Sequence, residues 1–464
     1  MSSASSNRTV IVIGSGLAGL SAASQAIAHN VPVHMLERAP KPGGNSIKAS
    51  SGINGAPTRF QTGVDNGFYS DTLTSTGHML SNMKAHREKL ISTLTKSSAD
   101  AVYWLADDKG IDLSRVAQLG GHSFPRTHRG AGKIPPGAAI VTTLLKSLNE
   151  SPLFQLSTSC EVTKLLKDGP KVQGVEYVSA DGQTSQLHGP VVTASGGFGG
   201  DAEGLLAKYR PDLAGFPSTC DARPGSQKLL TDVGAQLLDM DQVQVHPTGF
   251  IDPASADSHV KFLAAEMLRG EGGILIRDGQ RFVNEMDTRE HITDVITKAA
   301  PLDSSTRQWN VELVLDEATY AAAKSHVDFY LWKGLMRKTT ISELHPSASD
   351  TIREYSSIVS GATIDPFGRK YFGNWSLKDI EPDTVVYIGR VTPVVHFTMG
   401  GVLINERSEP LDHDGKPIDG VWAAGEVTGG IHGCNRLGGS SLLECVVFGR
   451  TAGDRAAATI KADH

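Results

Sequence analysis

A glycine-rich turn near the N-terminus constrains the fold more than any other feature of the sequence. The apolar, β-branched run at residues 9–13 predicts a buried parallel strand. It continues directly into Gly14-Ser-Gly16-Leu-Ala-Gly19, and an alanine-rich, helical segment follows. Residues 31–36 predict a second strand that ends at Glu37. The order of strand, glycine turn, helix and strand predicts a dinucleotide-binding βαβ unit.

The spacing within this unit gives each glycine and the acidic residue a role. Gly14 permits a tight turn, Gly16 lets a pyrophosphate approach the backbone, and Gly19 lets the helix pack on the strand. Glu37 follows Gly19 by 18 positions, close to the spacing expected of the residue that binds a ribose diol. Because its charge would repel a 2′-phosphate, the motif disfavours NADP.

Further glycine clusters help to choose between NAD and FAD. Gly43-Gly44-Asn45-Ser46 follows the first unit almost at once, and VWAAGE, which ends at Glu426, lies near the C-terminus beside TGGIHGCNRLGGSS. A long cofactor that spans several loops of one sheet explains such dispersed clusters better than a compact mononucleotide does. A long final helix, expected to begin between Gly438 and Ser441, would direct its positive N-terminal end toward the ligand.

Composition excludes several other functions. The 464 residues carry 44 basic and 50 acidic side chains, and the net charge of −6 gives no basic field for nucleic acid or an anionic membrane. The four cysteines form no Cys-x-x-Cys pair, which disfavours iron–sulfur and c-type haem sites. We expect no metal. Without a long apolar run or a secretory N-terminal pattern, we expect a cytoplasmic protein with no membrane partner.

The middle of the chain differs from its two ends. From about Pro247 to Pro393 a mixed stretch with Trp and Tyr lacks the βαβ rhythm, whereas residues 420–426 return to a strand followed by glycine. We therefore expect a second domain inserted into the nucleotide-binding domain.

Several motifs in collinear order resemble a known family. They are GGNSIKASSGINGA, QVHPTGF, EMLRGEGGILI, RFVNEMDTRE, HFTMGG, AAGEVTGGIHG and NRLGGSSL. Together they resemble the fumarate reductase and succinate dehydrogenase flavoproteins, and most closely the soluble fungal fumarate reductases, which also carry a stretch like LGGHSFPRTHR at 119–129. The resemblance implies an FAD-dependent oxidoreductase acting on CH–CH groups, which reduces fumarate to succinate.

The resemblance also implies an α/β fold with two domains. A Rossmann-like FAD-binding domain would be built from both chain ends, residues 1–245 and 397–464, and an α+β capping domain, residues 246–396, would close over the dicarboxylate. Members that bind flavin covalently carry a histidine just after the GG-x-S stretch, but residues 47–51 contain none, so we expect non-covalent FAD. The residues expected to bind FAD are Gly14, Gly16, Ala18, Gly19, Glu37, Asn45, Ser46, Ser51, Gly52, Val162, Glu426, Ser441 and Leu442.

Reduction of an alkene between two carboxylates requires cations for the carboxylates, a hydride donor and a proton donor. The resemblance places His246, His396, Arg436 and Gly439 at the substrate, with Arg436 able to make a bidentate fork. It makes Arg289 the proton donor, while Glu266 and Arg269 form the relay that reloads it.

The sequence departs from the family pattern at several positions. Ala265 stands where bacterial relatives have a threonine, Phe397 stands where they have a second histidine, and 223–227 replaces the usual Thr-Gly-Asp-Gly near the flavin. His122, Arg126 and His128 receive no catalytic role.

Two alternatives stay open at this point. The first is a reductase or dehydrogenase of another activated alkene, such as an enone. The second is a binding or scaffold role, if the altered 223–227 loop weakens FAD. For the main interpretation we expect a diffusible electron donor, either reduced flavin or NADH.

Overall fold

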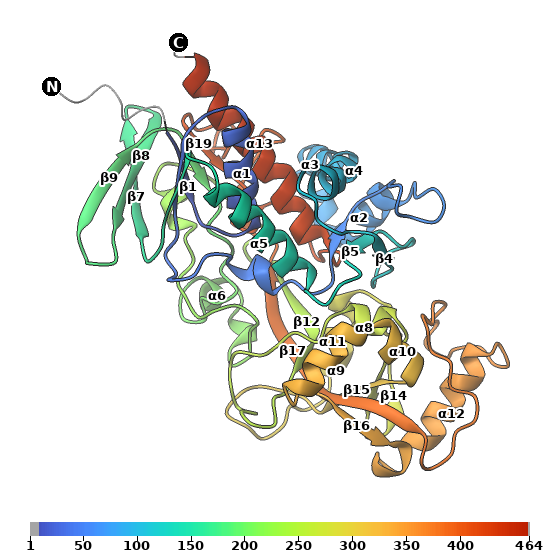
Figure 1. The fold of residues 1–464 in the computed structure, drawn as a ribbon. Coiled ribbons are helices and arrows are strands. Elements are labelled where there is room, and N and C mark those ends of the chain that lie inside the picture. The colour runs from blue at the N-terminus through green and yellow to red at the C-terminus, as the bar shows by residue number, and fades with distance from the viewer. Residues whose placement is uncertain (1–8, 463–464) are drawn as a thin grey trace.

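The structure, a computed structural model, describes residues 9–462. A five-stranded parallel sheet lies at the centre of the upper body in Figure 1, with the strand order β19-β10-β1-β2-β6. This sheet confirms the predicted α/β class. Its strands are β1 (Val10–Ile13), β2 (Val33–Leu36), β6 (Phe154–Ser157), β10 (Val191–Thr193) and β19 (Val421–Ala423).

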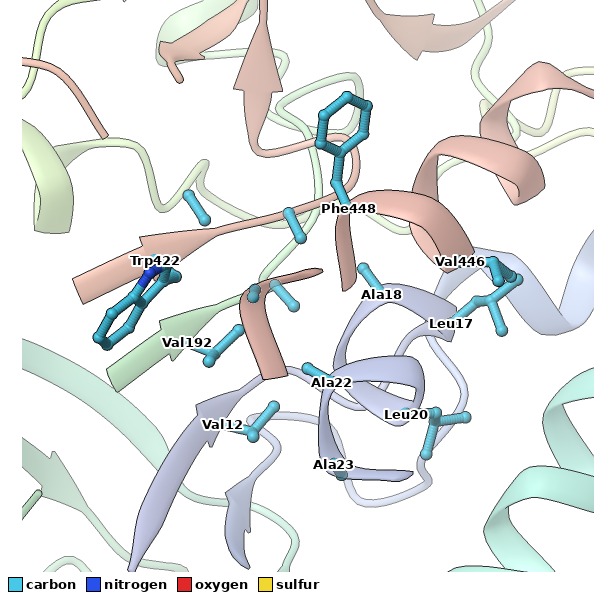
Figure 2. Close-up of a cluster of buried hydrophobic side chains, with 14 of the residues drawn as sticks. Val12, Leu17, Ala18, Leu20, Ala22, Ala23, Val192, Trp422, Val446 and Phe448 are labelled. Atoms are coloured by element: carbon cyan, nitrogen blue, oxygen red, sulfur yellow. The ribbon is translucent and has the colours of Figure 1, made fainter. Parts of the chain in front are cut away.

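Two helices from opposite ends of the chain pack together beside this sheet. They are α1 (Leu17–Ala28) and α13 (Ser440–Ala462). A Cβ atom at Gly449 would lie 2.5 Å from the carbonyl oxygen of Ala18, and one at Gly453 would lie 2.3 Å from that of Ala22. These glycines therefore let the helix backbones approach closely. Figure 2 shows α1 and α13 meeting among buried apolar side chains, with Val12 and Val192 of the sheet close by.

The remaining elements of the upper body surround the parallel sheet. Its other helices are α2 (Phe68–Thr76), α3 (Lys84–Lys96), α4 (Ser98–Tyr103), α5 (Pro136–Asn149), α6 (Leu205–Tyr209) and α7 (Lys228–Thr231). The small sheets comprise β3 (Ile53–Asn54), β4 (Arg115–Ala117) and β5 (Thr127–Arg129); β7 (Glu161–Asp168), β8 (Lys171–Val178) and β9 (Thr184–His188); and β11 (Leu237–Leu238), β18 (Gly401–Leu403) and β20 (Thr428–Gly429).

The lower body in Figure 1 is formed by the middle of the chain around an antiparallel sheet. The strands are β12 (Val243–Phe250), β13 (Ile274–Arg277), β14 (Gln280–Arg281), β15 (Val311–Leu315), β16 (Arg337–Thr340) and β17 (Val385–Thr398). The helices are α8 (Met267–Gly270), α9 (Arg289–Thr297), α10 (Glu317–Ala322), α11 (Lys324–Trp332) and α12 (Ala348–Val359). Separate hydrophobic clusters form the cores of the two bodies.

The two bodies are joined by the paired strands β12 and β17. The predicted domain boundaries, 246 and 396, both fall inside these strands, and the division of the chain there stays a prediction. Residues 1–8, which carry part of the expectation about the N-terminus, lie outside the described residues. Between residues 9 and 462, no helix has the length and apolar character needed to cross a bilayer.

Candidate active site

Most of the residues expected to bind the cofactor line a cavity of about 910 Å³. The lining residues also include side chains from α11 of the lower body, such as Phe329 and Tyr330. The expected FAD-binding residues that line it are Gly14, Gly16, Ala18, Glu37, Asn45, Ser46, Ser51, Gly52, Val162, Glu426, Ser441 and Leu442. Gly19 does not line it: a Cβ there would lie 2.0 Å from the Gly14 carbonyl oxygen, so Gly19 allows α1 to pack on the preceding turn.

The cofactor end of the cavity is a cradle of backbone. Gly14 has φ of +99°, and a Cβ there would lie 2.4 Å from the carbonyl oxygen of Ala194. A Cβ on Gly44 would lie 3.5 Å from the Cα of Gly16, so these two loops face each other closely. Ser46 Oγ accepts a hydrogen bond from the Leu17 backbone N–H at 3.0 Å and ties the loops together.

The polar groups of this cradle suit a dinucleotide such as FAD. Among the described residues, Asn45 Oδ1 and Ser50 Oγ are buried without a hydrogen-bond partner, although both side chains belong to residues that line the cavity. A buried polar atom without a partner is costly, and a polar ligand would supply one. With the glycine backbone beside them, the residues present therefore fit FAD.

Glu37 lies at the end of β2 and also lines the cavity. Its Oε2 accepts a hydrogen bond from the Ser15 backbone N–H at 2.9 Å, and its Oε1 accepts one from the Ala39 N–H at 2.8 Å. The side chain is only 5% exposed. These bonds fix the carboxylate in one orientation and leave further oxygen lone pairs for a ribose diol.

The other end of the cavity contains a buried Arg289–Glu266 ion pair. Thr288 caps α9, so that Arg289 is the first residue of the helix, and Glu266 directly precedes α8. Arg289 Nε donates to Glu266 Oε2 at 2.7 Å, and Nη2 donates to the same oxygen. Burial opposes the charge on Glu266, but Arg289 and Arg269 outweigh it and lower the Glu266 pKa to about 2.

Arg269 lies one turn along α8 from Glu266. Its Nη2 is 4.0 Å from Glu266 Oε1, too far for a direct hydrogen bond, and its Nη1 donates to the Glu285 carbonyl oxygen at 2.7 Å. Burial lowers the pKa of Arg269 to about 10, although Glu266 works in the opposite direction. Arg269 is therefore a stronger acid than an ordinary arginine.

Arg436 lies in the loop that leads into α13. Its guanidinium stacks on the Phe397 ring, with Cζ 4.4 Å from the ring centroid, and burial followed by the Arg289 charge lowers its pKa to about 9. Gln244 connects the two arginines, because its Oε1 accepts from Arg289 Nη1 at 2.9 Å and its Nε2 donates to the Arg436 carbonyl oxygen at 2.7 Å.

His246 and His396 face each other across β12 and β17. Their ring centroids are 5.4 Å apart. His396 is skipped in the pairing, since Gln244 pairs with Phe397 and Val245 pairs with Val395, so it occupies a β-bulge. Burial, and next the Arg289 charge, hold the pKa of both histidines well below the usual value, so both rings are neutral.

The hydrogen bonds of His246 identify which nitrogen can bind a ligand. Its Nδ1 accepts a hydrogen bond from the Thr248 backbone N–H at 3.2 Å, so the ring proton resides on Nε2. His246 Nε2 and Arg436 Nε have no partner elsewhere in residues 9–462. His396 Nδ1 lies 2.8 Å from Thr219 Oγ1. Buried N–H donors are thus free for a ligand at this end, and Arg269 adds its own unpartnered Nε and Nη2.

The structure brings Arg289, His396, Arg436 and Gly439 to the cavity wall. His246, Glu266 and Arg269 are not among the lining residues. The first two each lie next to a lining residue, and Arg269 lies next to Glu266. Sequence reasoning missed Gln244, Thr248 and Gly120. The backbone N–H of Gly120 donates to Glu266 Oε1 at 3.0 Å. Gln244 could have been found, because it lies two residues before His246 and alternate residues of a strand share a face. Residues 9–462 contain no group of His, Cys, Asp and Glu side chains arranged for a metal ion.

Comparison with known proteins identifies the family. Residues 9–442 match the FAD binding domain family. "Fumarate reductase 1" of Saccharomyces cerevisiae is 44% identical over 96% of this chain and 97% of its own length. The chain belongs to the fumarate reductase flavoprotein family. A Schizosaccharomyces pombe member named "Fumarate reductase" is 39% identical over 99% of this chain and 91% of its own length.

A solved structure of the family agrees with the fold. The open conformation of a flavocytochrome c3 fumarate reductase has a TM-score of 0.75 and 30% identity, covering 98% of this chain and 79% of that one. The cofactor of the family is FAD, and the residues of the cradle described above fit it. The altered loop at 223–227 lines the same cavity through Arg223, Pro224, Gly225 and Ser226.

Proposed function

We propose that this protein is an FAD-dependent fumarate reductase that forms succinate. One observation carries the proposal: the buried end of the cavity brings together three arginines, Arg269, Arg289 and Arg436, and unpartnered N–H donors. This cluster of cations and hydrogen-bond donors suits a dianion. Fumarate reduction also agrees with the names of the two yeast relatives.

The arginines and histidines of this end bind and orient the substrate in this proposal. Arg436 pairs with one carboxylate of fumarate, and the Nε2–H group of His246 donates a hydrogen bond to the dianion. His396 and the backbone at Gly439 complete the contacts. Since the guanidinium groups are buried, they interact with the substrate without competition from bulk water.

Arg289 delivers the proton in the proposed reaction. Bound, reduced FAD would supply the hydride for one alkene carbon, and an N–H of Arg289 would protonate the other. A guanidinium is ordinarily a very weak acid, so this transfer requires a strongly basic carbanion. Arg269, with its lowered pKa, then returns a proton to Arg289 through Glu266, and Arg269 takes up a proton from solvent to complete the cycle. The 4.0 Å gap between Arg269 and Glu266 has to shorten, or be bridged by water, for that step.

We further propose that the FAD is bound without a covalent link and is reduced by a diffusible donor, either reduced flavin or NADH. Residues 47–51 pass along the cavity and contain no histidine. Acid denaturation followed by ultrafiltration is expected to release all the flavin as FAD. Flavin that stays on the polypeptide would contradict this part. The cytoplasmic location expected from the sequence likewise stays a prediction.

Steady-state kinetics with purified, FAD-loaded protein test the proposed activity. Reduced FMN and NADH are supplied in separate assays, and fumarate-dependent oxidation of the donor is measured together with succinate. We expect one molecule of succinate to form for each molecule of donor that is oxidised. A steroid-type enone in place of fumarate is the matched control and is expected to give no turnover. Turnover of the enone without turnover of fumarate would favour the alternative alkene reductase.

A further inference from the structure

The segment at residues 119–129, which has no role in the reaction so far, contacts the proton-donating pair. Besides the hydrogen bond from the Gly120 N–H to Glu266, it contributes His122, which is 6% exposed. His122 Nε2 lies 3.1 Å from the carbonyl oxygen of Gly438. The segment therefore connects Glu266 with the loop that carries Arg436.

The contacts of His122 define its protonation state. Arg126 Nη1 lies 2.9 Å from His122 Nδ1, and since arginine can only donate, Nδ1 is the acceptor. The ring proton is therefore on Nε2 and is donated to Gly438. Arg126 is itself held at 2.6 Å by both Asp65 and Asp71. Burial, and then the Arg126 charge, lower the His122 pKa to about 4, so the ring stays neutral near pH 7.

Gly438 transmits this contact to the ion pair. A Cβ at Gly438 would lie 2.7 Å from Glu266 Oε2 and 3.2 Å from Arg289 Nη2, so its backbone packs directly against both groups. Its carbonyl oxygen accepts a second hydrogen bond, from Asn54 Nδ2 at 2.8 Å. A shift of this peptide would change the space that Arg289 and Glu266 occupy.

We propose that His122 is a positioning residue for proton delivery, acting through its hydrogen bond to Gly438 on the Arg289–Glu266 pair. The inference rests on the proposed function. His122 exchanges no proton with the substrate in this account. Because Arg126 donates to Nδ1, the ring proton of His122 stays on Nε2 and is donated to the Gly438 carbonyl oxygen. This hydrogen bond holds the Gly438 peptide in the position that keeps Arg289 directed toward the cavity.

A pair of amide substitutions isolates the hydrogen bond to Gly438. An asparagine reaches the position of His122 Nδ1 and still accepts from Arg126, but it does not extend to Gly438. A glutamine amide reaches the position of Nε2 and restores the donor. His122→Asn and His122→Gln are therefore compared with the wild-type holoenzyme in fumarate turnover, succinate affinity, flavin content and the solvent deuterium isotope effect on kcat.

We expect His122→Asn to lower kcat about tenfold and to increase the isotope effect, since small displacements at a reacting centre are costly. Succinate affinity and flavin content should match the wild type, and His122→Gln should recover most of kcat. The inference is overturned if His122→Asn keeps more than about half of wild-type kcat, loses succinate affinity in parallel or loses its flavin, or if His122→Gln is no better. Failure of the wild type to reduce fumarate would instead overturn the proposed function.

Discussion

The cofactor end of the cavity is made mainly of backbone, whereas the substrate end is made of charged side chains. At the cofactor end, Gly14, Gly16 and Gly44 line the cavity with main chain. At the substrate end, Arg289 and Arg436 are almost fully buried. The Arg289 guanidinium donates to Glu266, and the Arg436 guanidinium stacks on the Phe397 ring. The comparison indicates that substitutions at the first end should affect cofactor binding, and those at the second should affect turnover and substrate binding.

The largest effect is expected at Arg289. Arg289→Lys keeps a positive charge but loses the planar fork, and Arg289→Ala loses both. If Arg289 delivers the proton, both variants should lower kcat for fumarate by at least about 10³-fold, in the upper range for general acid catalysis. FAD content, measured from the flavin absorbance, should stay unchanged. Retention of more than a tenth of wild-type kcat by Arg289→Lys would reduce Arg289 to an electrostatic role.

The second effect concerns substrate binding by Arg436. Arg436→Met should raise KM for fumarate strongly, because losing one partner of a buried ion pair costs about 3–5 kcal/mol, or about 10²- to 4 × 10³-fold. Arg223→Met removes a cation from the cofactor end of the same cavity and is the matched control. It should leave KM unchanged. Equal effects of both variants on KM would break the distinction between the two ends.

A third effect is expected in cofactor binding. Glu37→Ala should weaken FAD by about 1.5–3 kcal/mol, the range for a hydrogen bond to a charged group. Titration of the apoprotein with FAD measures this loss, and KM for fumarate in the reloaded enzyme should not change. Glu161→Ala, which removes another acidic side chain from the cavity lining, is the control and should bind FAD as the wild type does. Unchanged affinity in Glu37→Ala would exclude Glu37 as the ribose ligand.

The smallest effect is a pH dependence. Burial lowers the Arg436 pKa to about 9, so the free enzyme loses this positive charge as pH rises through that value. Because the dianion binds the charged form, kcat/KM for fumarate should fall by up to about tenfold per pH unit above about pH 9. Bound dianion stabilises the charge, so kcat should fall only at higher pH. A profile of kcat/KM that stays flat to pH 10 would contradict this assignment.

The cofactor end could be predicted from the sequence because its determinants are local. The first βαβ unit lies within about forty residues, and its glycines occupy turns whose spacing is fixed by the backbone. Gly19 was grouped with the FAD ligands, yet it packs against Gly14 behind the cavity wall. Spacing identifies such a turn without separating glycines that touch a ligand from those that permit packing.

The substrate end could not be derived from local pattern. Glu266 directly precedes α8, Arg289 begins α9 and Arg436 lies in the loop before α13, so only the fold brings them together. The resemblance of the motifs to the family therefore predicts these residues, and the periodicity of the sequence does not. The neutral state of His246 and His396 could not be predicted from the sequence either, because it depends on burial among arginines that are distant in the chain. The role of Gln244 depends on the same tertiary contacts.

A single-turnover experiment tests most directly whether the two ends serve one reaction. The FAD-loaded protein is reduced without oxygen and mixed with one equivalent of fumarate, while the flavin absorbance is followed and succinate is measured. We expect full reoxidation of the flavin, with one succinate formed per FAD. The flavin of Arg289→Ala, reduced to the same extent, should reoxidise at least about 10³-fold more slowly. A wild-type flavin that stays reduced in the presence of fumarate would contradict the account.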